Sequence, residues 1–259
     1  MLPAVVDCLA CPYCRLPLSP VDGAVRCGRG HSFDLARQGY VALLPAGARL
    51  PAGDDAAMLA ARAGFLAAGH YAPLTAALVA AAGGTAGPVL DAAPAAVGIA
   101  LDASRYAARR AARAHPRAGA VVADAWSGLP VRTGAVGLVL DVFSPRNGPE
   151  TARVLRPGGL LVVVTPGPDH LAGLVDVLGG LQVDAAKDSR LAAALEPHLA
   201  PVERVEHRWE LALSRADAAR AVAMGPSARH LADLDARVAA LPEPVRATAS
   251  IVVSRYRRP

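Results

Sequence analysis

The cysteines of this chain gather near its beginning, where a histidine follows them closely. Cys11 and Cys14 form a C-x2-C pair, and Cys27 and His31 form a C-x3-H pair. Each pair can sit on one tight turn, so that three thiolates and one imidazole surround an ion as a tetrahedron. Clustered cysteines of this type are more typical of metal sites than of disulfide frameworks. We therefore predict a zinc site whose ligands are Cys11, Cys14, Cys27 and His31.

Cys8 competes with Cys11 for the place of the first ligand, because it also precedes a cysteine by three positions. It lies in an apolar lead-in without the Pro12-Tyr13 turn that joins the next pair, which favours Cys11. Unliganded thiols are the alternative to a metal site. A module this short buries too little apolar surface to fold alone, so bound metal would supply folding free energy. A folding staple and direct contact with substrate both stay open as its role.

The composition predicts a folded chain with two unequal domains. Of the 259 residues, 53% are hydrophobic, which excludes a disordered chain and suffices for one dominant core beside a small accessory module. No segment approaches the roughly 18 uninterrupted apolar residues that span a bilayer. An acidic residue and two cysteines stand where an export signal would carry basic residues and an apolar run. We expect a soluble, cytoplasmic protein with no membrane partner.

The net charge of +5 favours a polyanionic partner, because arginine pairs with phosphate in bidentate geometry. Nearly all of the cations are arginines, and Lys187 is the only lysine. Together with the enrichment in alanine, glycine and proline, this pattern is explained equally well by coding bias. Charge alone therefore does not establish nucleic-acid binding.

Two longer motifs follow the first cysteine pair. Residues 27–44 read CxxGHSFDxAxxGYVxLL, and residues 53–74 read GDxxxMxxARxxFLxxGHYxPL. Together with the CPxC of residues 11–14, this succession is similar to that of the large-subunit rRNA guanine-N1-methyltransferases, a family that includes macrolide-resistance enzymes of antibiotic producers. The resemblance covers nearly the whole chain.

The resemblance implies an α/β fold, in which a small N-terminal zinc ribbon precedes a class I methyltransferase domain with a Rossmann-like, mostly parallel sheet. It divides the chain into a zinc-binding module at residues 1–45, a helical linker or cap at 46–86 and the methyltransferase domain at 87–259. It also implies S-adenosylmethionine (SAM) and Zn²⁺ as cofactors, 23S rRNA as partner, and methylation of guanine N1 in a hairpin loop. Tyr71 is expected to border the cofactor pocket, with a simple core contact as the alternative.

Hydrophobic periodicity predicts the elements that position these residues. Helical spacing covers residues 58–66 and 71–82, and two glycines then end the second helix. From residue 87 short apolar runs alternate with helical segments, which is typical of a parallel sheet covered by helices. Strands are expected at 89–91, 97–102, 120–124, 136–143 and 160–165, with helices at 105–115 and up to 153 between them, and two further strands at 202–213 and 247–258.

Acidic residues stand at the carboxyl ends of three of these strands, where ligands of open parallel sheets bind. Asp102 is placed to accept the ribose hydroxyls of SAM, as the acid after the second strand does in related dinucleotide folds. Asp124 resembles the acid that binds the adenine amino group, and Asp91 is expected near the methionine end of the ligand. Solvated strand ends are the alternative interpretation of each.

Only five residues separate Asp91 from Val97. A parallel crossover with its helix needs at least about 10 residues, so this link cannot contain one. The glycine-rich loop by which family members approach the methionine carboxylate is missing from the sequence, and Pro94 removes one more backbone donor. Three explanations stay open: a segment lost from the sequence, a degenerate homologue that binds cofactor poorly, or a rearranged pocket.

Methylation at guanine N1 displaces a proton and needs an unpaired or flipped-out base in line with the methyl group. Candidate residues follow the fourth and fifth strands. Phe143 could stack on the base, and Arg146 or Asn147 is expected near a phosphate or the guanine O6. Asp169 and His170 are expected to start a helix, with His170 as the candidate base and a helix N-cap as the alternative role of Asp169.

Three functions are therefore weighed for the chain. The first is SAM-dependent methylation of guanine N1 in 23S rRNA. The second is a non-catalytic or degenerate rRNA-binding homologue that has lost the cofactor loop, and the third is a small-molecule methyltransferase that carries a zinc ribbon. The sequence does not determine which guanine is modified, whether the chain confers macrolide resistance, or whether it forms a homodimer.

Overall fold

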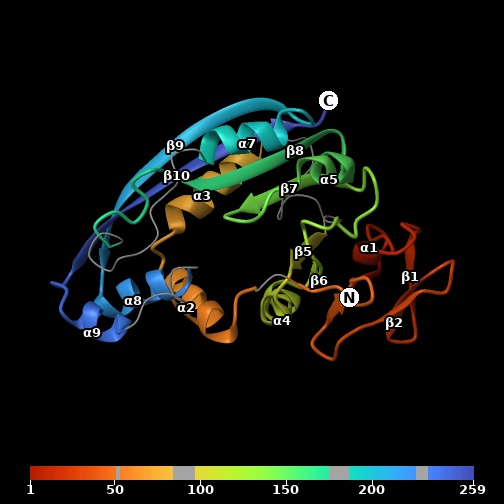
Figure 1. Cartoon of the computed structure of the whole chain (residues 1–259), viewed down its shortest axis with the longest axis horizontal. Coiled ribbons are helices and arrows are strands. Elements are labelled where there is room, and N and C mark those ends of the chain that lie inside the picture. Colours follow the sequence, from red (N-terminus) through yellow and green to blue (C-terminus); the bar gives the residue numbers. More distant parts are fainter. Residues whose placement is uncertain (51–52, 84–96, 175–186, 226–232) are drawn as a thin grey trace.

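Three sheets and the helices that cover them make up the computed structural model of the chain (Figure 1). The structure describes residues 1–50, 53–83, 97–174, 187–225 and 233–259. The strand expected at 89–91, with Asp91, and the short link after it lie outside the described residues. The other expected elements can be compared with those observed.

The smallest sheet belongs to the N-terminal module, and its strands pair antiparallel in chain order. The strands are β1 (Leu18–Val21), β2 (Ala24–Cys27) and β3 (Ser32–Asp34). Asp22 and Gly23 form the turn between β1 and β2, and both have positive φ. Two-residue hairpin turns of this type match the twist of the flanking strands, which explains the Asp-Gly sequence.

The second sheet is parallel, with the order β4-β6-β5. Its strands are β4 (Tyr40–Ala42), β6 (Ala118–Val122) and β5 (Gly98–Asp102). Helix α4 (Arg105–Ala114) covers one face through small alanine side chains. Helix α1 (Pro3–Val6) lies on the other face, where Val5 leaves no room for a Cβ atom at Gly119. Residues 40–42, expected within the zinc-binding module, thus join this sheet directly.

The largest sheet has the order β7-β8-β10-β9 and lies across the top of the molecule in Figure 1. Its strands are β7 (Val136–Val142), β8 (Leu155–Pro166), β10 (Val245–Arg257) and β9 (Ala200–Leu213). β7 and β8 are parallel, and β10 is antiparallel to both of its neighbours. Helix α3 (Ala72–Ala82) packs on one face, and α5 (Gly148–Val154) and α7 (Lys187–Leu195) lie on the other.

The remaining helices form a group beside the two larger sheets. α2 (Ala56–Ala67) packs against α8 (Arg215–Ala223), which in turn contacts α9 (Leu234–Ala239). Within the described ranges no single helix is long and apolar enough to cross a membrane. α2 and α3 reach the required length and composition only as a pair, and an 85° bend separates them.

Most observed elements, β6 among them, match the expected ones within two residues at each end, but β8 and one helix differ. β8 begins at Leu155, five residues earlier than expected, because the turn with Gly158 at φ +73° is taken up within the strand. β6 ends at Val122, so Asp124 stands in the following loop. The expected helix start at Asp169 and His170 is wrong, since residues 168–173 form successive turns and Leu174 is the first helical residue after them.

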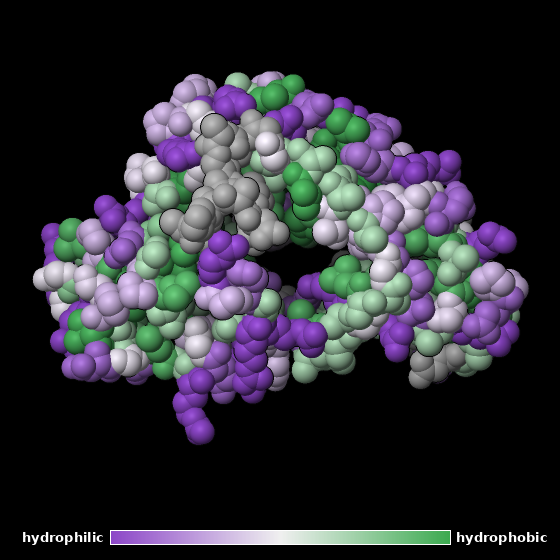
Figure 2. Space-filling model, turned by 180° about the vertical axis from the view of Figure 1, so that it is seen from behind, coloured by the Kyte–Doolittle hydropathy of each residue, from purple (hydrophilic) through white to green (hydrophobic). Residues whose placement is uncertain are grey.

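Within the described part of the chain, β5 and β7 belong to separate sheets. Figure 2 shows the molecule hollowed below the largest sheet, between that sheet and the part of the chain that carries α2 and α4. Ligands of parallel sheets bind at the carboxyl ends of the strands, which here are the ends of β5 and β6 in one sheet and of β7 and β8 in the other.

Candidate functional site

The four predicted zinc ligands lie together in the N-terminal module. The ligand atoms of Cys11, Cys14, Cys27 and His31 are all within 4.8 Å of one another. Nδ1 of His31 is 3.4 to 3.6 Å from the three sulfurs, and the sulfurs of Cys14 and Cys27 are 3.6 Å apart. Zinc bonds of about 2.3 Å to sulfur and about 2.0 Å to nitrogen give tetrahedral edges of roughly 3.5 to 3.8 Å. The cluster therefore fits a zinc ion.

Neighbouring groups hold this cluster in shape. Tyr13, in the turn between Cys11 and Cys14, stacks on the His31 ring with ring centroids 4.8 Å apart. The backbone N–H of Cys27 donates to the carbonyl oxygen of His31 at 3.0 Å, which closes the second turn. Cys8 lies outside the cluster, and its sulfur is 3.5 Å from the carbonyl oxygen of Ala4.

The two buried cysteines of the cluster differ in acidity. Burial raises the pKa of the Cys11 thiol. Burial also acts to raise the pKa of Cys27, but hydrogen bonds from the backbone N–H groups of Arg29 and His31 outweigh it and lower that pKa to about 6. Since metals bind the thiolate, the lowered pKa of Cys27, at the end of β2, favours its ligand form.

Asp102 and Asp124 stand at one edge of the parallel sheet. Asp102 ends β5 and pairs with Val122, the last residue of β6, so Asp124 lies two residues beyond the end of the neighbouring strand. The carbonyl oxygen of Asp102 accepts the N–H of Ala123 at 3.1 Å. The structure thus brings together two of the three acids that were expected to bind SAM.

The start of α2 lies against Asp102. Oδ1 of Asp102 accepts the N–H of Ser104 at 2.7 Å, and the Ser104 hydroxyl donates to the carbonyl oxygen of Asp54 at 2.6 Å. Burial raises the pKa of Asp102, and the nearby charge of Asp54 adds to this. Arg62 pairs with Asp54 at 2.5 Å and balances part of that charge. Sequence reasoning did not assign these three neighbours, although Asp54 and Arg62 stand in the motif of residues 53–74.

Asn147 joins the loops that follow β6 and β7. Its Nδ2 donates to the carbonyl oxygens of Ala125 and Trp126, at 2.9 and 3.2 Å. Its Oδ1 accepts the N–H of Glu150 at 3.3 Å, so Asn147 caps α5. Asp124 lies in the same β6 loop, where its Oδ1 accepts the N–H of Trp126 at 2.9 Å. The carboxyl ends of β6 and β7 therefore lie side by side, although their strands are in different sheets.

Tyr71 and His170 form a hydrogen-bonded pair at the end of β8, with 3.1 Å between the Tyr71 hydroxyl and Nε2 of His170. Nδ1 of His170 accepts the N–H of Ser250 at 3.3 Å. A neutral imidazole that accepts at Nδ1 carries its proton on Nε2, so Nε2 donates to the Tyr71 oxygen. Tyr71 is only 5% exposed, and burial raises the pKa of its hydroxyl. Both ring nitrogens of His170 are thus engaged in this arrangement.

Phe143 lies beside this pair, with its ring centroid 5.7 Å from that of His170. It follows β7, is 42% exposed and has φ +54°. Left-handed backbone at a bulky residue is strained, and such strain is concentrated at functional sites. An exposed aromatic ring held in this way can stack on a planar ligand.

Asp169 does not cap a helix. Its carboxylate accepts a hydrogen bond from Nε of Arg208 on β9 at 2.7 Å. Hydrogen bonds from Ser250 and Arg208 lower the pKa of Asp169, so the group is a weak base. It lies next to His170 in the chain but is held by the edge of the largest sheet.

The predicted residues thus fall into three groups. The zinc ligands form the first, and Asp102, Asp124 and Asn147 form the second at the ends of β5, β6 and β7. Tyr71, Asp169 and His170 form the third, around the end of β8. The second and third groups both adjoin β7, where Phe143 and Asn147 are separated by only three residues.

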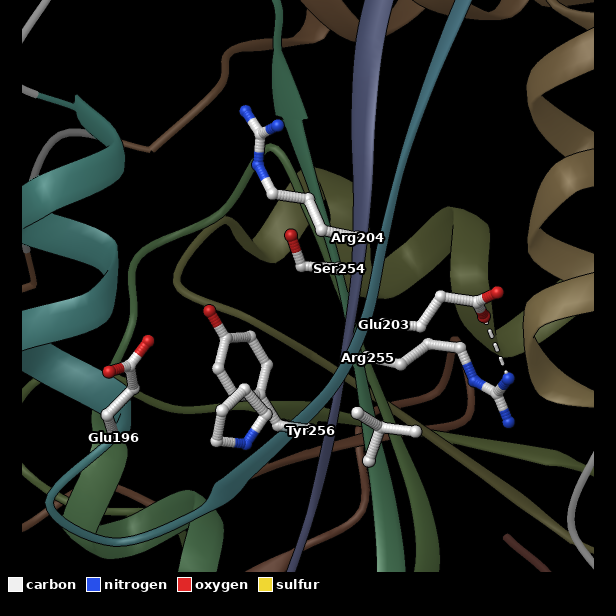
Figure 3. Close-up of a pocket in the computed structure, with 8 residues that line it drawn as sticks. Glu196, Glu203, Arg204, Ser254, Arg255 and Tyr256 are labelled. Atoms are coloured by element: carbon white, nitrogen blue, oxygen red, sulfur yellow. Dashed lines mark hydrogen bonds and ion pairs between the residues drawn. The ribbon is translucent and has the colours of Figure 1, made fainter.

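A separate pocket of about 300 Å³ lies where β9 begins and β10 ends (Figure 3). The lining residues are Glu196, Pro201, Val202, Glu203, Arg204, Ser254, Arg255 and Tyr256. Arg255 pairs with Glu203 at 2.9 Å, as the dashed line in Figure 3 marks. None of the predicted site residues lines this pocket, so the candidate site stays at the strand ends.

Comparison with known proteins gives close relatives. The family model of the N-terminal zinc ribbon of RlmA matches residues 9–49. A protein of Micromonospora griseorubida assigned as a 23S rRNA (guanine-N(1)-)-methyltransferase is 49% identical over 99% of both chains. The 23S rRNA (guanine(748)-N(1))-methyltransferase of Streptomyces fradiae is 48% identical over 92% of both chains.

The first of these alignments spans 295 positions, which is 36 more than the 259 residues of this chain. The Micromonospora relative therefore has at least that many residues without a counterpart here. The zinc cluster, the paired strand-end acids and the extent of the identity agree on one assignment. The chain begins with a zinc ribbon and belongs to the 23S rRNA (guanine-N1)-methyltransferase family.

Proposed function

We propose that this chain transfers a methyl group from SAM to N1 of a guanine in 23S rRNA. The observation that carries the proposal is the identity of 49% over 99% of both chains with a relative assigned that reaction. The placement of Asp102 at the end of β5 and of Asp124 in the loop after the neighbouring parallel strand β6 supports it, because this is the edge at which such sheets bind nucleotides.

The two acids would hold the nucleoside part of SAM, which supplies a methyl group activated on a sulfonium. Asp102 is fixed by the Ser104 N–H at one oxygen, and a carboxylate retains further acceptor capacity for the two ribose hydroxyls. Asp124, in the loop of the next strand, would accept from the adenine amino group. The methionine end would be bound by Asp91 and its neighbours, which lie outside the described residues.

Phe143, together with the third group of residues around the end of β8, would hold the guanine. Phe143 would stack on the base, supported from behind by His170. The N1 proton must leave as the new bond forms. His170 is the candidate acceptor, but it could take that proton only after exchanging its bond with Ser250 or Tyr71, so we assign it first the orientation of Tyr71 and Phe143. Asn147 and Asp169 would act by positioning the β7 loop and Arg208.

The ribbon would hold one zinc ion through Cys11, Cys14, Cys27 and His31. Four protein ligands leave no open position on a tetrahedral ion, which is the arrangement of structural sites. The zinc would therefore stabilise the module and its contact with β6, while the methyl transfer takes place at the strand ends.

The test is methyl transfer from labelled SAM to 23S rRNA that lacks the modification, followed by primer extension. Methylation at N1 blocks Watson-Crick pairing, so the polymerase should stop one nucleotide before the modified guanine. At SAM concentrations near the wild-type Kd, the variant Asp102→Asn should weaken the stop strongly, while Asp233→Asn, an exposed aspartate before α9, should retain it. Labelling without a stop at guanine would contradict the proposal.

A second function, binding of rRNA without methyl transfer, is favoured by one observation. At least 36 residues of the Micromonospora relative have no counterpart here, and we place that loss between Asp91 and Val97, where a crossover is too short to form. Calorimetric titration with SAM separates the two functions. Absence of SAM binding by a zinc-loaded protein that still binds rRNA would favour the second.

A further inference from the structure

Helix α4 has two unlike faces. Its inner face, with Ala108, Ala111 and Ala112, packs on the strands of the parallel sheet. Its outer face carries exposed arginines and one exposed aromatic ring, and the helix contains no acidic residue. These outer residues are Arg105, Tyr106, Arg109, Arg110 and Arg113, and the Tyr106 side chain is 51% exposed.

The arrangement of these charges opposes helix stability. Arg105, Arg109 and Arg113 follow one another at i, i+4 spacing, at which like charges repel on a helix surface. Arg105 also stands in the first turn, where the helix dipole disfavours a cation. Folding alone therefore gives no reason for this pattern, whereas an external polyanion would remove the repulsion.

Acidic partners for these arginines are missing among the residues that the structure describes. Other arginines of the chain do have them, each within 3.6 Å of a carboxylate: Arg15, Arg62, Arg153, Arg204, Arg208, Arg220 and Arg255. The outer face of α4 is thus a concentration of uncompensated positive charge and not a network of ion pairs.

Helix α4 also lies between the proposed cofactor edge and the zinc ribbon. It begins three residues after Asp102, with Ser104 as its N-cap. On the other side, a Cβ atom placed at Gly39, in the turn between β3 and β4, would lie 3.6 Å from Ala112. The exposed face of α4 therefore runs from the proposed cofactor edge toward the zinc ribbon.

We propose that the outer face of α4 binds the phosphate backbone of the RNA substrate, an inference that rests on the proposed function. Arginine forks bind phosphate oxygens in pairs, and the exposed Tyr106 ring offers a stacking surface to an unpaired base. An anionic lipid surface fits less well, because this face has no aliphatic side chain larger than alanine to insert between lipids.

The test compares the double variant Arg109→Gln/Arg113→Gln with Arg237→Gln/Arg246→Gln, which removes the same charge from exposed positions on α9 and β10. The probe is a fluorescein-labelled RNA hairpin with guanines in its loop, titrated with zinc-loaded protein at about 50 to 200 mM KCl. Each lost phosphate contact removes roughly 0.7 to 0.9 from the slope of log affinity against log salt. We expect the α4 variant to lose about 1.4 to 1.8 of slope and at least about tenfold in affinity at low salt, and the control to match the wild type.

A wild-type slope in the α4 variant, with an unchanged circular dichroism spectrum, would overturn the proposal. Phosphatidylserine vesicles serve as a second probe. If the α4 variant lost affinity for the vesicles but not for the RNA hairpin, the proposal would also be overturned, because the partner would then be a lipid surface. Removal of the arginines relieves repulsion, so the variant should melt no lower than the wild type. If the wild type bound RNA in a salt-dependent way but transferred no methyl group, the proposed function would be contradicted and this inference would stand. If the wild type transferred the methyl group and the α4 variant kept the wild-type slope, the proposed function would stand and this inference would be contradicted.

Discussion

The guanidinium of Arg15 lies 3.6 Å from the carboxylate of Glu150 in α5. Arg15 follows the zinc ligand Cys14 directly and also donates to the carbonyl oxygen of Leu129 at 2.8 Å. Glu150 accepts the N–H of Leu129 at 2.7 Å, so both charged groups hold the loop that begins at Asp124. The zinc cluster is thereby joined through one arginine to a loop that carries a proposed SAM-binding residue.

Loss of Arg15 should loosen this loop without loss of zinc. Trp126, 61% exposed in the loop, becomes the only tryptophan in a Trp209→Phe background, so its fluorescence anisotropy reports loop motion. In that background we expect Arg15→Ala to lower the anisotropy of zinc-loaded protein, because its hydrogen bond to Leu129 in the loop and its ion pair with Glu150 in α5 disappear. Arg26→Ala, an exposed arginine that also adjoins a ligand cysteine, should leave it unchanged at equal zinc content. Equal anisotropy in the two variants would show that the contact does not order the loop.

Glu150 should also contribute to the acid sensitivity of the fold. Hydrogen bonds from Arg153, together with the N–H of Leu129, hold the pKa of Glu150 below its usual range. A folded-state pKa below the unfolded value stabilises the fold above the unfolded pKa, and this contribution is lost as pH falls through the folded pKa. Glu150→Gln should therefore melt below the wild type at neutral pH, and the difference should shrink below about pH 4.

Melting curves across pH measure this effect, and Glu206→Gln provides the control. Glu206 pairs with Arg204 at 2.7 Å, but its side chain is 69% exposed, so the pair contributes little. Zinc release in acid is common to all of these proteins and cancels in the comparison. A difference between Glu150→Gln and the wild type that persists unchanged at low pH would show that its origin is not the ionised carboxylate.

Asp102 should make SAM binding sensitive to pH. Hydrogen bonds to an ionised acceptor contribute about 1.5 to 3 kcal/mol, so Asp102→Asn should weaken SAM binding by roughly 10- to 100-fold. Because burial raises the pKa of Asp102, the wild-type affinity should begin to fall at a higher pH than an ordinary aspartate would cause. Equilibrium dialysis with labelled SAM measures both effects. An affinity that is equal in Asp102→Asn and the wild type would remove this residue from the site.

The sequence was sufficient for what depends on local pattern. Apolar spacing located α2, α3 and α4, and the cysteine spacing located the metal cluster. In both cases the residues that interact are close together in the sequence. The pairing of Tyr71 with His170 spans 99 positions and depends on how α3 packs on β8 and β10, which no local pattern records. The same holds for Asp54 and Arg62, which approach Asp102 only because the start of α2 lies against the start of α4.

The Tyr71 and His170 pair allows a test of whether the histidine acts as a base or as a positioning group. Tyr71→Phe leaves the Nε2 proton of His170 without its acceptor and should cost about 1 to 3 kcal/mol of unfolding free energy. Tyr106→Phe, which removes an exposed hydroxyl, should cost nothing measurable.

If His170 only orients its neighbours, Tyr71→Phe and His170→Phe should lower kcat to similar extents and leave the pH profile of kcat unchanged. If His170 accepts the N1 proton, only His170→Phe should remove the acidic limb of that profile, because a base must be deprotonated to act. The kcat profiles of the two variants, measured at equal zinc content, therefore decide between the roles.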